Sequence, residues 1–147
     1  MRDVSQHFEL IEKAIEYSGA TEAVIEIKRR DTARGLINGV VYFADGLRLE
    51  FSERVTIEKS RLVKSKYRYQ FVQNDVAIFR YDNAPHHEHV ATHPHHKHVG
   101  KKILPAIEPE FRQVLDEAAR LVKDEGQSAG KERRSRRTRK TKDNHED

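Results

Sequence analysis

The sequence predicts an α+β fold: an antiparallel meander of about five strands with an N-terminal and a C-terminal helix packed on one face. Three observations predict it. Apolar residues recur at helical spacing near the N-terminus and again after residue 109, and between these regions lie segments in which apolar and polar residues alternate. Pairs of turn-forming residues join some of these segments. The 147 residues suit one domain. We expect that single domain to span residues 1–125, with a disordered basic tail at 126–147.

The N-terminal segment carries an apolar stripe at helical spacing. Its members recur every three or four positions, and they are Val4, His7, Phe8, Ile11, Ala14 and Ile15. This spacing is typical of an amphipathic helix, and Gly19 is expected to end it. Because His7 lies on the stripe, we interpret it as a histidine at the edge of the core and not as a ligand.

Strand patterns follow the helix. They cover residues 23–30, 36–44, 47–58, 66–71 and 76–81. Asp45-Gly46 and Asn74-Asp75 predict tight hairpins, because these residue types accept a positive φ angle. A second helix is expected after Pro109, since proline suits the first turn. Its apolar positions are Phe111, Val114, Leu115, Ala118, Leu121 and Val122.

If both helices cover one face of the sheet, the other face is free to contact a ligand. Lysine and arginine pair with phosphates, and aromatic rings stack on unpaired bases. The candidate RNA-binding residues are therefore Lys66, Tyr67, Arg68 and Tyr69. An ordinary solvated sheet face shows the same alternation, and this alternative remains open.

The charge of the chain is concentrated at its C-terminal end. Residues 131–147 hold eight Lys or Arg and four acidic residues, and their net charge of +4 equals that of the whole chain. Such a tail can add affinity for RNA phosphates without reading sequence, or it can serve only for solubility.

Composition also excludes several classes of function. The absence of cysteine excludes a disulfide scaffold, a thiolate zinc site and a cysteine nucleophile. The sequence shows neither a signal-peptide pattern nor an apolar run long enough to span a membrane. We therefore expect a cytoplasmic protein with no membrane partner.

Seven of the nine histidines lie in residues 86–98, and Pro85 and Pro94 predict that this run is a loop. A metal-free ribonuclease needs a base for the ribose 2′-OH, an acid for the departing 5′-oxygen and a cation for the phosphate. Imidazole can serve as both acid and base near neutral pH. The candidate catalytic residues are His86, His87, His95, His96, His98, Arg80, Asp82 and Lys97, with Asp82 orienting an imidazole. This mechanism requires no cofactor.

Two other interpretations of the histidine run remain. His86 with His89 and His95 with His98 form His-x-x-His spacings, so a divalent metal could bind there, with Asp82 or Glu88 as an oxygen ligand. Alternatively, the histidines only form hydrogen bonds with the loop backbone, while Asp82 and Asn83 form a turn at the strand end.

Three sequence blocks resemble a known family. Lys-Ser-Lys-Tyr-Arg-Tyr-Gln-Phe at 64–71, Ile-Phe-Arg-Tyr-Asp-Asn-Ala-Pro-His-His at 78–87 and Thr-His-Pro-His-His-Lys-His-Val-Gly at 92–100 resemble the core of the TumE-type toxins of prokaryotic toxin-antitoxin modules. The match covers residues 64–101. It departs at Glu88, where proline is expected, and at His93, where an aromatic residue is usual.

The resemblance implies a toxin whose partner is a cognate antitoxin, and it assigns no catalytic residue. Together with the histidine chemistry, it leads us to expect an endoribonuclease acting on RNA. The alternatives are a non-catalytic module that binds nucleic acid or a protein partner, and a metal-dependent enzyme. Nucleotide transfer onto tRNA is less supported, because Gly35 and Gly39 do not belong to a phosphate-binding loop motif.

Overall fold

The structure is a computed structural model that describes residues 1–122. Its elements follow one another along the chain as α1 (Val4–Glu16), β1 (Glu22–Arg29), β2 (Arg34–Tyr42), β3 (Leu47–Glu58), β4 (Arg61–Gln73), β5 (Val76–Asp82), β6 (His96–Val99), β7 (Lys102–Pro105) and a C-terminal helix at 111–122. Within residues 1–122, no helix is long and apolar enough to cross a membrane.

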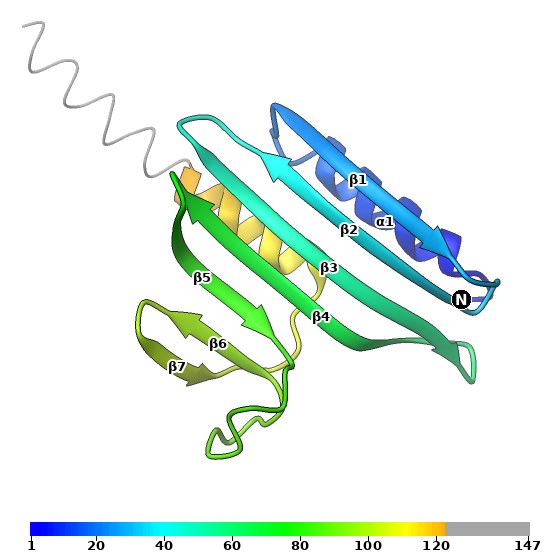
Figure 1. The fold of residues 1–147 in the computed structure, drawn as a ribbon. Coiled ribbons are helices and arrows are strands. Elements are labelled where there is room, and N and C mark those ends of the chain that lie inside the picture. The colour runs from blue at the N-terminus through cyan, green and yellow to red at the C-terminus, as the bar shows by residue number, and fades with distance from the viewer. Residues whose placement is uncertain (123–147) are drawn as a thin grey trace, which may run out of the picture.

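The strands of residues 1–122 form one antiparallel seven-stranded sheet in which each strand pairs with its neighbour in sequence (Figure 1). The α+β class and the meander are confirmed, but the expected number of about five strands is wrong. Asp45-Gly46 and Asn74-Asp75 have positive φ angles and join strands as predicted. A third turn, Lys59-Ser60, also has two positive φ angles, although its residue types give no strong turn signal.

The two additional strands, β6 and β7, lie at the end of the predicted loop and directly after it. Pro94 lies just before β6, so it limits the strand without interrupting it. The alternation of His96 and His98 with Lys97 and Val99 is the period of a strand, and the pairing of Val99 with Lys102 closes a tight hairpin. The irregular part of the histidine run is therefore confined to residues 83–95.

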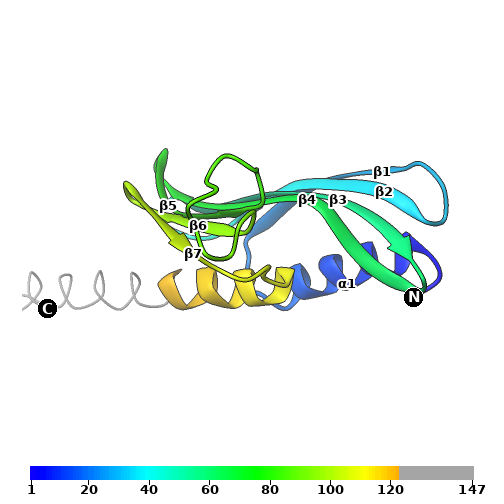
Figure 2. The same cartoon turned by 90° about the horizontal axis from the view of Figure 1, so that it is seen from below.

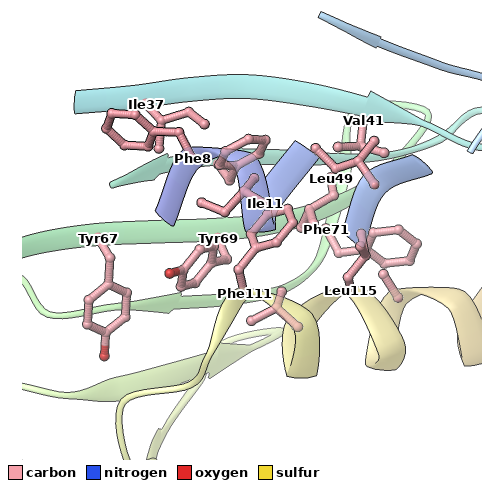
Figure 3. Close-up of a cluster of buried hydrophobic side chains, with 14 of the residues drawn as sticks. Phe8, Ile11, Ile37, Val41, Leu49, Tyr67, Tyr69, Phe71, Phe111 and Leu115 are labelled. Carbon is pink, nitrogen blue, oxygen red and sulfur yellow. The ribbon is translucent and has the colours of Figure 1, made fainter. Parts of the chain in front are cut away.

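Both helices lie on the same side of the sheet (Figure 2). Their buried side chains join those of the central strands in one hydrophobic cluster, which includes Phe8, Ile11, Leu49, Phe71, Phe111 and Leu115 (Figure 3). Burying these side chains is the main favourable contribution to folding. The predicted tail at 126–147 lies outside the described residues.

Side chains of β4 alternate between the two faces of the sheet. Tyr67, Tyr69 and Phe71 are buried on the helix-covered face, whereas Lys66 and Arg68 are exposed on the opposite face. We call this opposite face, which no helix of residues 1–122 covers, the open face (Figure 2).

Candidate functional site

Strand pairing places four polar residues side by side on the open face. In the β5–β6 ladder, Arg80 lies opposite His98 and Asp82 lies opposite His96. Residues two apart on a strand share a face, and cross-strand partners share it too, with Cβ atoms about 5 Å apart. Arg68 of β4 lies opposite Asp82 on its other side, so the same face continues into the centre of the sheet.

Asp82 and His96 form a buried pair, with exposed fractions of 6% and 2%. The Nε2 atom of His96 lies 2.9 Å from Oδ1 of Asp82, and its Nδ1 atom lies 2.8 Å from the Pro94 carbonyl oxygen. A carbonyl oxygen and a carboxylate both accept hydrogen bonds. Both contacts of His96 are therefore satisfied when its ring carries two protons.

His98 contacts a different kind of partner. The Nη2 group of Arg80 lies 2.9 Å from Nε2 of His98, while Nε of Arg80 donates to Asp82 at 2.9 Å. A guanidinium can only donate, so Nε2 of His98 must accept and the ring is neutral. Desolvation, followed by the charge of Arg80, lowers the pKa of His98, which agrees with this assignment.

His87 reaches the same place from the loop. Its ring centroid lies 4.9 Å from that of His96 and 5.5 Å from that of His98, and the latter two are 4.8 Å apart. Desolvation and the neighbouring His96 lower the pKa of His87. We call His87, His96 and His98 the histidine cluster. Within residues 1–122 it is the one group of three or more His, Cys, Asp or Glu side chains whose potential ligand atoms all lie within 4.8 Å of one another.

Other histidines proposed for catalysis or metal binding lie outside this cluster. His86 and His89 are exposed on the loop, and His95 turns toward the core, where its Nδ1 atom lies 2.8 Å from the hydroxyl of Tyr67. Of the four metal candidates predicted from the spacings, the cluster therefore contains only His98. The two His-x-x-His pairs do not converge, because neither an irregular loop nor a strand follows a helical repeat.

Lys97, which was predicted to act with these histidines, lies apart from the histidine cluster. Strand alternation turns its side chain to the helix-covered face, where its Nζ atom lies 2.7 Å from the carboxylate of Glu117. Burial would lower the pKa of Lys97, but the hydrogen bonds with Glu117 and Tyr81 and the charge of Glu117 together outweigh it, and the pKa is raised. Lys97 joins β6 to the C-terminal helix.

The predicted RNA-binding residues also lie on two different faces of the sheet. Lys66 and Arg68 are exposed on the open face, together with Arg54, which pairs with Lys66 across β3 and β4. None of these three forms an ion pair with another described residue. Tyr67 and Tyr69 are 2% and 0% exposed, so neither ring is accessible to a base in this structure.

Asp82 and Asn83 also have the turn-forming role considered from the sequence. Oδ1 of Asp82 accepts a hydrogen bond from the backbone of Ala84 at 3.0 Å. The side chain of Asn83 accepts a hydrogen bond from the Tyr67 amide and donates one to the Ser65 carbonyl. These bonds connect the chain to β4 just after β5 ends at Asp82. These contacts hold the start of the loop beside the cluster.

A second polar group, which the sequence analysis missed, lies inside the core. Glu53 is 0% exposed, with its carboxylate 2.6 Å from Nε2 of His7 and 2.5 Å from the Tyr69 hydroxyl. The Nζ atom of Lys64 donates to the same hydroxyl at 2.7 Å and to a backbone carbonyl, that of Pro109. The sequence pattern indicates that Glu53 is buried, because it follows Leu47, Leu49 and Phe51 at every second position on the apolar face of β3. We call His7, Glu53, Lys64 and Tyr69 the buried network.

Charges within the buried network compensate one another. Burial alone would raise the pKa of Glu53, but the hydrogen bonds from His7 and Tyr69 and the nearby positive charges, first that of Lys64, together outweigh it, and the pKa is lowered. Burial lowers the pKa of Lys64 despite the nearby carboxylates. Burial and the Glu53 charge raise the pKa of the Tyr69 hydroxyl well above its usual value.

The fold and the site together define an α+β protein with a half-covered antiparallel sheet and a histidine cluster at one end of its open face. The family model described as Toxin TumE matches residues 7–125 of the chain. The chain therefore belongs to the TumE toxin family, which implies the toxin component of a toxin-antitoxin module with an antitoxin as partner. No curated protein and no solved structure matches the chain.

Proposed function

We propose that this toxin is a ribonuclease whose acid-base chemistry takes place at the histidine cluster. The observation that carries the proposal is the convergence of two accessible imidazoles, those of His87 and His98, on Arg80 and the buried Asp82–His96 pair. These are the groups that metal-free cleavage next to a ribose 2′-OH needs.

The roles follow from accessibility. His87 and His98 are partly exposed and can exchange protons with a substrate, whereas His96 is too buried to touch one. The negative charge of a bound phosphate favours protonation of one of the two accessible rings, which then serves as the acid while the other is the base. Arg80 stabilises the charge on the phosphate, and Asp82 and His96 are positioning residues that hold Arg80 and the other rings in place.

The open face supports binding of a polyanion next to this site. Arg68 lies opposite Asp82, and Arg54 and Lys66 extend the line of cations across β3 and β4. Adjacent strands are about 4.8 Å apart, so the cations follow one another at distances that an RNA backbone can span.

Cleavage of single-stranded RNA by the purified chain tests this proposal. We expect His87→Ala and His98→Ala to reduce the cleavage rate by about 100- to 10,000-fold, because proton transfer contributes that much. His86→Ala is the matched control from the same loop, and its rate should stay close to that of the wild type. Activity should persist in excess EDTA.

Several outcomes would contradict the proposal. Full activity of both variants would exclude acid-base catalysis at this cluster. Binding of RNA without cleavage by the wild type would favour a non-catalytic binding module. Loss of activity in EDTA would favour a metal-dependent enzyme, because a metal site loses its bound nucleophile on chelation.

A further inference from the structure

Both ring nitrogens of His96 face a hydrogen-bond acceptor. The Pro94 carbonyl oxygen lies 2.8 Å from Nδ1 and accepts a hydrogen bond when Nδ1 carries the ring proton. In that tautomer the lone pair of Nε2 lies on the side of Asp82, 2.9 Å away, where a metal ion can contact both groups. A hydrogen bond from the second ring nitrogen to a backbone carbonyl is a common support for a metal-binding histidine.

The arrangement of the three rings suits such an ion. Their centroids are 4.8–5.5 Å apart, and the ring planes are inclined to one another by 69–73°. Three imidazoles around one zinc ion, with metal-nitrogen distances of about 2.0–2.1 Å, have centroids separated by roughly 5 Å. Asp82 lies beside two of the rings, 2.9 Å from Nε2 of His96 and 3.4 Å from Nε2 of His98.

We propose that His87, His96 and His98 bind one Zn²⁺ ion, with Asp82 beside it as an oxygen donor. Neutral imidazole nitrogens favour zinc and its neighbours in the transition series, whereas calcium and magnesium prefer sites made of oxygen. Arg80 competes with the ion, because its Nη2 group occupies Nε2 of His98 and carries the same sign of charge. Its side chain is 34% exposed and can withdraw into solvent.

Zinc at this position would occupy the nitrogen lone pairs that accept protons in the proposed mechanism. The ion therefore inhibits cleavage, and this consequence rests on the proposed ribonuclease function. The binding itself does not depend on that function, and it is measured separately.

The binding test is titration of the untagged full chain with Zn²⁺ by calorimetry, and with Co²⁺ by visible absorption, which reports tetrahedral coordination. We expect one ion per chain, an affinity at least about 10-fold weaker in His87→Ala and in His98→Ala, and no change in His86→Ala. Arg80→Gln should bind zinc more tightly than the wild type, although it removes a group proposed for cleavage. Circular dichroism checks that each variant is folded. The test uses His87 and His98, which are partly exposed, because replacing the buried His96 could disturb the fold.

No binding, or equal affinity in wild type, His87→Ala and His98→Ala, would overturn the zinc site. If zinc binds as expected but stimulates cleavage, the inhibitory role is overturned. If the chain binds zinc and cuts no RNA under any condition, the ribonuclease proposal fails while the metal site stands.

Discussion

Two histidine–carboxylate pairs lie on opposite faces of the same sheet and differ in what surrounds them. His7 and Glu53 meet at 2.6 Å inside the core. His96 and Asp82 meet at 2.9 Å on the open face. Side chains of the core enclose the first pair. Next to the second pair lie the partly exposed imidazoles of His87 and His98 and, further along the open face, the exposed Arg54, Lys66 and Arg68.

The difference shows that pairing alone does not leave groups accessible to a ligand. In the buried network every polar group of Glu53 and Tyr69 is satisfied by a protein partner, so a substrate has no group to contact. At the histidine cluster, a buried pair of the same chemistry holds neighbours that remain accessible. Access to solvent, and not the residue types, separates the two pairs.

The largest effect that tests this comparison is expected at Glu53. Glu53→Ala leaves the partly buried Lys64 and the polar groups of His7 and Tyr69 without their partner, which should cost about 3–5 kcal/mol of unfolding free energy. Urea denaturation measures it. The matched control is Glu50→Ala on the same strand, where the carboxylate is 33% exposed and pairs with Arg48. The control should cost about 0–1 kcal/mol. Equal losses would mean that the buried network does not stabilise the fold.

The buried network should also affect how the unfolding free energy changes with pH, by less than the loss expected for Glu53→Ala. The folded-state pKa of Glu53 lies below its ordinary value of 4.5. As pH falls, the unfolded chain takes up this proton first, so the stability that the charged form provides above pH 4.5 is lost as pH approaches the lowered value. Unfolding free energies measured from about pH 6 to about pH 3 should therefore decline less steeply in Glu53→Gln than in the wild type. An identical slope would contradict the assigned role of the Glu53 charge.

The smallest effect concerns the two faces as RNA-binding surfaces. Lys66→Ala and Arg68→Ala should weaken RNA binding similarly for all sequences, each reducing the salt dependence of log K by about 0.7 on a single strand. Lys13→Ala, at an exposed position of α1 on the helix-covered side, is the matched control and should leave the slope unchanged. Fluorescence anisotropy at several salt concentrations measures these slopes. If Lys13→Ala alters the slope by the same amount, RNA does not bind selectively to the open face.

Local patterns in the sequence were sufficient for the class of fold and for most of its elements. Helical spacing predicted α1 and the C-terminal helix, and Asp45-Gly46 and Asn74-Asp75 predicted their hairpins, because these preferences act between near neighbours. The family could also be recognised from the blocks within residues 64–101, and the family match confirms it.

Only the tertiary structure decided which polar residues lie together. The sequence placed Asp82 and the histidines in one region, but the register of β5 and β6 selects His96 and His98, turns Lys97 to the other face and brings His87 over the pair. The buried network likewise joins α1, β3 and β4 over as many as 46 residues of chain. Such contacts depend on strand register and burial, which arise from the packing of the whole domain and not from the spacing of neighbours.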